Sequence, residues 1–268
     1  HLSIAKGYEN AARSALDVGA NVFQFFSRNP RGSSSKVLDM KDVENMNRIL
    51  EENDFGPLLA HAPYIINLAS YKPNIYGMAK GILKEDYKRL NELYIPYFTF
   101  HPGNHVGKGT EYGIERIAEA LNEIITGKET TMLLLETMAG QGTEIGKTFQ
   151  EMREIIDRVE YNELIGICLD TCHVHAAGYD IVDDLDGVLE EFDQIIGMDR
   201  LKAIHLNDNM MDYDSKKDRH AKIGEGTIGI KAIKNIINHP ILKNIPFYLE
   251  TPNELEGYKK EIELLRRP

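Results

Sequence analysis

The stretch ERIAEALNEIITGKETTMLLLE, residues 115–136, contains the repeating unit that decides the fold. Its first half carries apolar residues at intervals of three and four, which predicts an amphipathic helix over 115–125. These positions are Ile117, Leu121, Ile124 and Ile125. A β-rich apolar run, 131–136, follows and ends on the carboxylate of Glu136. The unit is therefore a helix followed by a buried strand with an acidic residue at its end.

The same alternation continues in both directions from this unit. Strands are predicted at 21–26, 57–61, 97–101, 131–136, 166–170, 201–205 and 246–250. Helices are predicted at 9–18, 40–52, 75–93, 115–125, 148–159, 182–195, 230–237 and 255–266. Strands that alternate with helices in this way predict parallel pairing through right-handed crossovers.

Eight such units in a chain of this length favour an α/β fold of the (β/α)8 TIM-barrel type. Seven strands are visible in the 268 residues, which begin His1-Leu2-Ser3 without a methionine. We therefore expect that a few residues precede His1 and that the first strand is truncated. An open doubly wound sheet is disfavoured, since no G-x-G-x-x-G follows the first visible strand. No linker divides the chain, and Ser33–Ser35 are interpreted as a loop insert, so residues 1–268 are predicted to form a single domain.

Composition narrows the class of protein. No run of eighteen apolar residues occurs, so a transmembrane helix and a membrane partner are not expected. The two cysteines, Cys168 and Cys172, make a poor disulfide framework, which favours a reduced, cytoplasmic location. The formal charge of −11 argues against nucleic acid as a partner. However, three bound divalent cations would add about +6 inside one pocket, so the overall charge does not decide this question.

Nine side chains that can ligate metal gather at or beyond the predicted strand ends. Six of them close, or nearly close, a strand: His61, His101, Glu136, Asp170, His205 and Glu250. His173 follows Asp170 by one turn, and Asp218 and His220 have the i, i+2 spacing that aims two side chains the same way in an extended segment. Barrel active sites lie at the carboxyl ends of the strands. One ion needs three or four protein ligands, so nine suit a cluster of up to three ions.

Each of these residues also has an ordinary structural interpretation. A lone histidine can be a hydrogen-bonded core residue, Asp170 can cap a turn, and strand-end glutamates can pair with lysine or arginine. Such explanations would have to hold independently in seven segments, so the collective pattern favours metal ligation. We expect His105, His175 and His239 to be structural or solvated residues and not ligands. Asp208 is expected to orient a ligand histidine.

Seven segments, taken together, resemble the endonuclease IV family of apurinic/apyrimidinic endonucleases. They are HAPYIINLAS (61–70), FHPGNHVG (100–107), LLETMAGQGTEIG (134–146), CLDTCHVHAAGYD (168–180), IHLNDN (204–209), DRHAKIGEGTIG (218–229) and YLETP (248–252). The match runs in order over essentially the whole chain. The resemblance implies a TIM barrel with three zinc ions that acts in base excision repair.

The resemblance also assigns the ligands. It implies that His61, His101 and Glu136 bind one zinc, and that Glu136 bridges to a second. The second zinc is then also held by Asp170, His205 and Glu250, and the third by His173, Asp218 and His220. Glu136 and Glu250 are the implied catalytic residues. Manganese or iron would suit some of these positions as well, because imidazole and carboxylate ligands accept them.

The reaction implied is hydrolysis of the DNA phosphodiester 5′ to an abasic site, which leaves a 3′-hydroxyl and a 5′-deoxyribose phosphate. Paired zinc ions lower the pKa of a bound water from ~15.7 toward ~7. The expected partner is double-stranded DNA that contains abasic sites, and the expected oligomeric state is a monomer. The implied DNA contacts are Arg31, Tyr64, Ile65 and Arg219, with Arg28 and Lys36 as further cations of the loop around Arg31. The chain departs from the family where Gly32 and Ser33 follow Arg31 and in having no tryptophan.

Two other functions would use part of the same set of residues. A sugar isomerase or epimerase on the same barrel would use Glu136, Asp170, His205 and Glu250 with a single divalent ion. That function leaves the remaining five candidate ligands without a role, and metal stoichiometry separates the two. A catalytically silent lesion binder would keep the loop cations but lose a ligand, and no ligand is missing.

Overall fold

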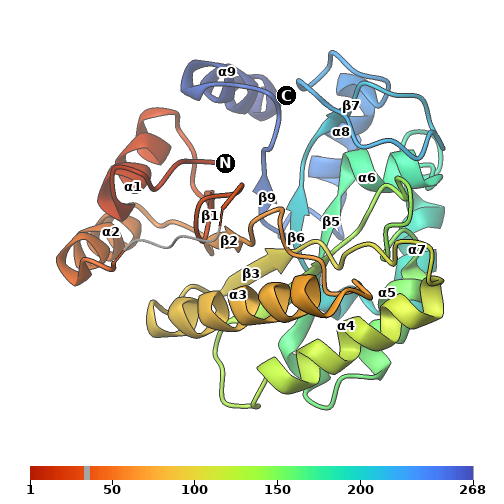
Figure 1. Ribbon diagram of the computed structural model, residues 1–268. Coiled ribbons are helices and arrows are strands. Elements are labelled where there is room, and N and C mark those ends of the chain that lie inside the picture. The colour runs from red at the N-terminus through yellow and green to blue at the C-terminus, as the bar shows by residue number, and fades with distance from the viewer. Residues whose placement is uncertain (33–36, 268) are drawn as a thin grey trace.

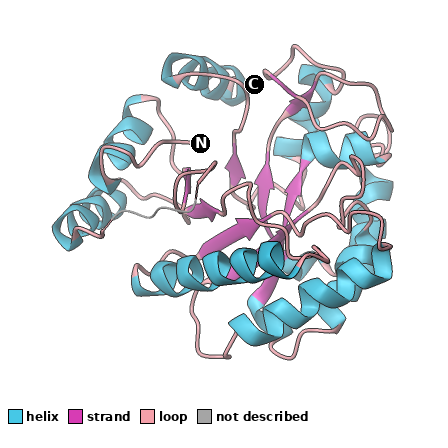
Figure 2. Ribbon diagram, viewed as in Figure 1, coloured by secondary structure: helices cyan, strands magenta, loops and turns pink. Residues whose placement is uncertain are grey.

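A parallel sheet of seven strands, surrounded by helices, forms the centre of the computed structural model, which describes residues 1–32 and 37–267 (Figures 1 and 2). The strands are β1 (Gln24–Phe26), β2 (Leu59–His61), β3 (Tyr97–Phe100), β4 (Met132–Glu136), β5 (Ile165–Asp170), β6 (Leu201–His205) and β9 (Phe247–Tyr248). They follow one another in this order, and every neighbouring pair is parallel. The predicted α/β TIM-barrel fold is confirmed. The serine cluster Ser33–Ser35 and Lys36 lie outside the described residues.

The eight predicted helices are all present around the outside of the sheet. They are α1 (Tyr8–Asp17), α2 (Met40–Glu52), α3 (Pro73–Glu92), α4 (Thr110–Ile124), α5 (Phe149–Asp157), α7 (Leu185–Ile195), α8 (Gly229–Asn238) and α9 (Leu255–Arg266). Their apolar faces and the outward-facing side chains of the strands form the large buried core. Across the ranges that the structure describes, no helix is long and apolar enough to cross a membrane.

Several short elements were not predicted from the sequence. They are α6 (Thr171–Ala177), the antiparallel pair β7 (Asp208–Asn209) and β8 (His220–Ala221), and the 3-10 turns η1 (Asn162–Leu164) and η2 (Met198–Arg200). Helix α6 begins directly at the end of β5, where the side chain of Asp170 accepts a hydrogen bond from the His173 N–H at 2.8 Å. The β7–β8 pair carries His220 opposite Asn209.

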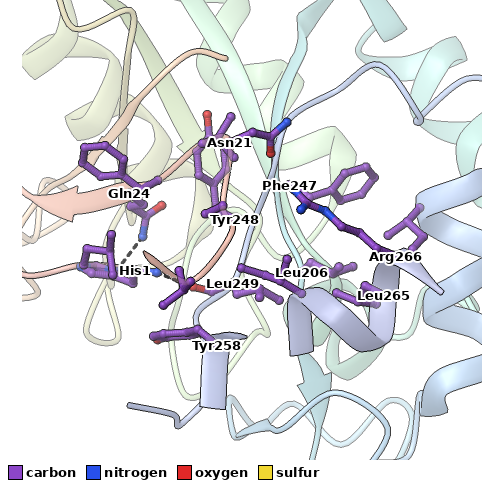
Figure 3. Close-up of a pocket in the computed structure, with 17 residues that line it drawn as sticks. His1, Asn21, Gln24, Leu206, Phe247, Tyr248, Leu249, Tyr258, Leu265 and Arg266 are labelled. Atoms are coloured by element: carbon purple, nitrogen blue, oxygen red, sulfur yellow. Dashed lines mark hydrogen bonds between the residues drawn. The ribbon is translucent and has the colours of Figure 1, made fainter. Parts of the chain in front are cut away.

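The first two residues lie between the two outermost strands of the sheet. The N–H of Leu2 donates to the carbonyl of Gln24 in β1 at 2.7 Å, and the amino group of His1 donates to the carbonyl of Leu249, just after β9, at 2.8 Å. They therefore occupy the place of an eighth strand between β1 and β9. A cavity of about 230 Å³ lies beside them, lined by residues of β1, β9 and α9 (Figure 3).

A small apolar layer fills the inside of the barrel. It consists of Leu59, Leu134, Cys168, Ala203 and Tyr248, one residue from each of five strands. Val22 packs against this layer just before β1. Successive side chains of a strand point to opposite faces, so the residue two positions later in each strand also points inward. The next level of the barrel interior, at the carboxyl ends of the strands, is where the ligand candidates stand.

Candidate metal centre

Five ligand candidates stand two residues after a member of the inner apolar layer. The five are His61, Glu136, Asp170, His205 and Glu250, which follow Leu59, Leu134, Cys168, Ala203 and Tyr248 respectively. His101 directly follows β3 and comes two residues after the buried Thr99. The period of the strand therefore turns six side chains toward the same interior space, at the edge of the barrel where the sequence predicted them.

His61, His101 and Glu136 form the first group. Each offers one ligand atom, and these atoms lie within 4.8 Å of one another. Oε2 of Glu136 lies 3.2 Å from Nε2 of His61 and 3.4 Å from Nε2 of His101. Two imidazole nitrogens and one carboxylate oxygen are a donor set typical of zinc sites that keep one position open.

Glu136 also belongs to the second group, with Asp170, His205 and Glu250. Its other oxygen, Oε1, lies 3.1 Å from Nδ1 of His205. The same nitrogen lies 3.2 Å from Oε2 of Glu250 and 3.7 Å from Oδ2 of Asp170. The carboxylate of Glu136 therefore faces the first group with one oxygen and the second group with the other.

The third group consists of His173, Asp218 and His220. Oδ2 of Asp218 lies 3.3 Å from Nε2 of His173, and Oδ1 lies 3.3 Å from Nε2 of His220. His173 comes from α6, whereas His220 begins β8 and Asp218 lies two residues before it. This group adjoins the second one, because Nε2 of His220 is 3.6 Å from Oδ2 of Asp170.

Three histidines of the centre are anchored by Nδ1, which contacts a backbone carbonyl in each of them. Nδ1 of His61 lies 2.6 Å from the carbonyl of Ala62, and Nδ1 of His173 lies 2.8 Å from the carbonyl of Thr137. Nδ1 of His220 lies 3.2 Å from the carbonyl of Glu250. A carbonyl accepts only a protonated nitrogen, so each ring, in its neutral form, presents the lone pair of Nε2 to the pocket, as metal-binding histidines do.

Two of these Nε2 atoms support a metal site directly. In the part of the chain that the structure describes, the buried Nε2 atoms of His173 and His220 have no hydrogen-bond partner. A buried polar atom without a partner is costly, and coordination of an ion removes that cost. The donor set and these two atoms together fit a bound metal.

The electrostatics of the centre are those of histidines surrounded by buried carboxylates. Burial alone would raise the pKa of the Glu136 carboxyl, but the charges of His205 and His101 and their hydrogen bonds hold it well below its usual range. Burial would lower the pKa of His173, but Asp170 and Asp218 raise it well above its usual value. Concentrated negative charge of this kind attracts divalent cations.

Both cysteines are free and buried near the centre. Burial raises the pKa of the Cys168 thiol to about 11 and raises that of Cys172 further. Cys172 also forms a spatial group with Asp170 and His220, so its sulfur lies within reach of the third group. With their pKa values raised in this way, both thiols stay protonated at neutral pH in the absence of metal.

Asp208 does not orient a ligand histidine, contrary to the expectation from the sequence. Its buried carboxylate accepts hydrogen bonds from the backbone N–H groups of Gly224, Gly226, Ile228 and Gly229 at 3.0–3.3 Å. A side chain at Gly226 would collide with the Asp208 carboxylate and the Asn209 carbonyl. Asp208 therefore holds the loop that follows β8 against β7.

The four expected DNA contacts differ in how exposed their side chains are. Arg31 and Arg219 are exposed, and Ile65 is half-buried against the core. Tyr64 is 58% exposed, and its ring lies 5.9 Å from the rings of both His61 and His101. The N–H of Tyr64 donates to the carbonyl of Pro30 at 3.1 Å, which ties this loop to the one that carries Arg31.

Arg28 differs from the other cations of its loop. It is buried, and its guanidinium donates to both oxygens of the buried Asp86 at 2.8 and 2.5 Å. The hydroxyl of Ser27 donates to the same carboxylate at 2.7 Å. Arg28 is therefore a structural residue that anchors the loop to α3, and the cation that this loop exposes among its described residues is Arg31.

Gln24 and Asn207 are two residues of the centre that the sequence did not reveal. The amide of Asn207 donates to Oδ2 of Asp170 at 2.7 Å, and its oxygen accepts from the N–H of Glu250 at 3.0 Å. Gln24 contacts His205 and Glu250 from β1. An amide carries no charge and is not a usual metal ligand, so neither residue stood out before the barrel brought it to the ligands.

Comparison with known proteins gives one consistent result. Residues 12–267 match the family described as xylose isomerase-like TIM barrel. The chain is 54% identical to a protein named "Probable endonuclease 4" of Clostridium beijerinckii, over 99% of this chain and 96% of that protein. A relative of the same name in Methanosphaera stadtmanae is also 54% identical, with the same coverage.

Solved structures agree with the sequence relatives. The crystal structure of endonuclease IV from Thermus thermophilus superimposes with a TM-score of 0.88 at 32% identity, covering 99% of this chain and 96% of that one. A D-tagatose 3-epimerase-like protein reaches a TM-score of 0.74 at 18% identity, which is a likeness of fold alone. This chain therefore belongs to the xylose isomerase-like TIM-barrel family and, within it, to the endonuclease IV family of apurinic/apyrimidinic endonucleases.

Proposed function

We propose that this protein is a metal-dependent endonuclease of base excision repair that hydrolyses the phosphodiester 5′ to an abasic site in double-stranded DNA. The products are a 3′-hydroxyl and a 5′-deoxyribose phosphate. The observation that carries the proposal is the convergence of nine imidazole and carboxylate side chains into three adjoining groups, with Glu136 common to two of them. Membership of the endonuclease IV family supports the same reaction class.

Three zinc ions are the cofactors proposed, one in each group. His61, His101 and Glu136 would hold the first, and Glu136, Asp170, His205 and Glu250 the second. His173, Asp218 and His220 would hold the third. Imidazole and carboxylate donors suit zinc, and manganese or iron would be accepted at some of the same positions.

The bound ions would supply a water nucleophile at neutral pH and positive charge for the phosphate oxygens. Glu136 would keep the first two groups at a fixed separation, because each of its oxygens faces one of them. Glu250 would orient the attacking water with its carboxylate. The third group adjoins the second through Asp170 and His220, so charge can be neutralised on both sides of the phosphorus, as in-line displacement requires.

The exposed residues around the centre would engage the DNA. Arg31 and Arg219 would contact the DNA from the loops that border the ligands, with the guanidinium groups suited to phosphate. Tyr64 and Ile65 would fill the space left by the missing base. An abasic nucleotide has no base to unstack, so turning it into the centre costs little. We place this activity in a cytoplasmic monomer.

Incision of a defined duplex tests the proposal. The substrate carries one tetrahydrofuran analogue of an abasic site and a 5′ label on the damaged strand. Zinc-loaded protein is expected to cut on the 5′ side of the analogue, and pretreatment with a strong chelator should abolish the product. An uncut duplex after incubation with metal-loaded protein would refute the proposed reaction. His239→Ala is a matched control, since this histidine pairs with Asp186 outside the three groups.

Metal content separates this function from a sugar isomerase or epimerase. The second group alone would satisfy a single-metal sugar enzyme, and solved structures of that fold include a D-tagatose 3-epimerase-like protein. The five ligand candidates outside that group would then have no role. Elemental analysis of the purified protein should give three metal ions per chain, whereas one ion per chain would favour the sugar enzyme.

A further inference from the structure

Gln24 stands on β1 at the level where the other strands present metal ligands. It comes two residues after Val22, which packs against the inner apolar layer, just as Glu250 comes two residues after Tyr248. The period of the strand therefore turns the Gln24 side chain into the barrel. It is fully buried, and Figure 3 shows it beside His1 at the edge of the cavity between β1 and β9.

The amide of Gln24 contacts two ligands of the second group with opposite polarity. Its oxygen lies 2.6 Å from Nε2 of His205, and its nitrogen lies 2.5 Å from Oε1 of Glu250. The same nitrogen lies 2.9 Å from Nδ1 of His1. Oε1 of Glu250 therefore accepts one amide hydrogen of Gln24, and the amide oxygen has one donor in His205.

Only one orientation of the Gln24 amide is consistent with these contacts. A carboxylate can only accept, so the NH2 end of Gln24 must face Glu250. The oxygen end must then face His205, which has to donate from Nε2. With Nε2 donating to Gln24, Nδ1 is the nitrogen left to offer a lone pair to a metal, and it is the one that faces Glu136, Asp170 and Glu250. His205 is opposite in this respect to His61, His173 and His220, whose Nδ1 atoms contact backbone carbonyls.

We propose that Gln24 is a positioning residue that fixes the tautomer of His205 and the orientation of Glu250, and so sets the metal affinity of the second group. This inference rests on the proposed metal-dependent function. An uncharged amide can perform both tasks at once because it carries a donor and an acceptor at a fixed separation. Hydrogen-bonded partners of this kind typically change metal affinity by about 10- to 100-fold when they are removed.

Two substitutions separate positioning from simple packing. Gln24→Leu keeps a similar volume but removes both polar ends. Gln24→Glu keeps the acceptor for His205 while replacing the donor to Glu250 by a second carboxylate. Asn21→Leu is the matched control, because Asn21 lines the same cavity and its side chain is exposed (Figure 3). Thermal unfolding of each metal-loaded variant shows whether it is folded.

The first measurement is the ring proton of His205 in zinc-loaded protein with 15N-labelled histidine. We expect a slowly exchanging Nε2–H in the wild type, in Gln24→Glu and in Asn21→Leu, and loss of that protection in Gln24→Leu. The second measurement is release of zinc to a competing chelator. Gln24→Leu should release one of its three ions about 10- to 100-fold faster than the wild type, and Asn21→Leu should not.

Two results would overturn the inference. One is a folded Gln24→Leu variant that keeps both the protected Nε2–H and the wild-type release rates. The other is equal acceleration of all three ions in Gln24→Leu and Asn21→Leu, which would indicate a general loss of packing. Neither result tests the proposed incision reaction. A wild-type protein that binds no metal or leaves the abasic duplex uncut would instead refute the proposed function.

Discussion

Oε1 of Glu136 lies 3.1 Å from Nδ1 of His205, while Oε2 of the same carboxylate faces His61 and His101. One side chain thus joins two groups of ligand candidates that come from six different strands or strand ends. This sharing follows from the central position of β4, whose carboxyl end points Glu136 into the middle of the barrel. Glu136 is therefore the residue whose loss should affect the largest part of the centre.

Glu136→Gln should abolish incision while DNA binding largely survives. The amide has nearly the same shape, but its nitrogen has no lone pair for a metal, so one of the two groups loses its oxygen. We expect the rate of incision to fall at least about 1,000-fold, equivalent to about 4 kcal/mol of transition-state stabilisation. Single-turnover cutting and a mobility-shift assay measure the two properties. Glu144→Gln is the control, because Glu144 is a half-buried glutamate on the segment that follows β4 and lies outside the three groups. Retained turnover in Glu136→Gln would contradict the bridging role.

The sequence predicted the parts of this centre that depend on regular repetition. Helix–strand alternation gave the barrel, and the strand ends gave the positions of His61, Glu136, Asp170 and His205. The i, i+2 spacing of Asp218 and His220 predicted that their side chains point the same way. Oδ1 of Asp218 lies 3.3 Å from Nε2 of His220. These features follow from local periodicity, which a single sequence displays.

Other parts could not be predicted because they depend on contacts between distant segments. Helix α6 has no solvent-exposed face over Thr171–Ala176, which are all buried, and therefore lacks the amphipathic pattern of a surface helix. The β7–β8 pair is two residues long on each side, too short for a visible alternation. The pairing of Arg28 with Asp86 joins residues 58 positions apart. Gln24 acquires its role only when the fold brings β1 to the side chains of His205 and Glu250.

Asp208→Ala should remove the third metal before the other two. The carboxylate accepts from the N–H groups of Gly224, Gly226, Ile228 and Gly229; the Ile228 bond is buried and the other three are partly buried. Because a buried donor left unpaired costs about 1–3 kcal/mol, we expect a loss of about 1–3 kcal/mol in stability and loosening of the β8 segment that carries His220. Metal analysis after dialysis measures occupancy, and two ions per chain are expected. Three retained ions at wild-type affinity would disprove the effect, and Asp212→Ala, an exposed aspartate nearby in sequence, serves as control.

Zinc binding should strengthen as the pH rises through neutrality. In the metal-free protein, neighbouring carboxylates raise the pKa of His173 despite burial, so the ring carries a proton that a metal must displace. Proton release on binding, measured by calorimetry in buffers of different ionisation enthalpy, tests this expectation. Binding that takes up protons, or that weakens from about pH 6 to about pH 8, would contradict it.

The stability of the metal-free protein should also have a maximum between two pH limits. His173 sets the alkaline limit and Asp218 sets the acid limit. The folded pKa of His173 lies above the unfolded value, so its contribution is complete below about pH 6.5 and is lost as the pH rises through the folded pKa. For Asp218, burial opposes ionisation, but the contact with His173 and the charge of that ring lower the pKa from 3.8 to about 2. Its contribution is present above pH 3.8 and disappears as the pH falls toward 2. Thermal unfolding across pH, with and without zinc, measures both limits, and added zinc should remove the alkaline one. An alkaline limit that persists with zinc would contradict this assignment.

Arg28 and Arg31, three residues apart in one loop, should respond to substitution in opposite ways. Arg28→Ala leaves the buried Asp86 carboxylate without its guanidinium, and such a loss costs about 3–5 kcal/mol of stability. Arg31→Ala removes an exposed cation, so the unfolding temperature should stay within a degree or two of the wild type. Its affinity for abasic DNA should fall, and the slope of log affinity against log salt should decrease in magnitude by about 1 because one phosphate contact is lost. An unchanged salt slope in Arg31→Ala would show that this arginine does not pair with a phosphate. A stable Arg28→Ala protein with weakened DNA binding would instead mean that the buried pair opens on DNA and that Arg28 reaches the backbone itself.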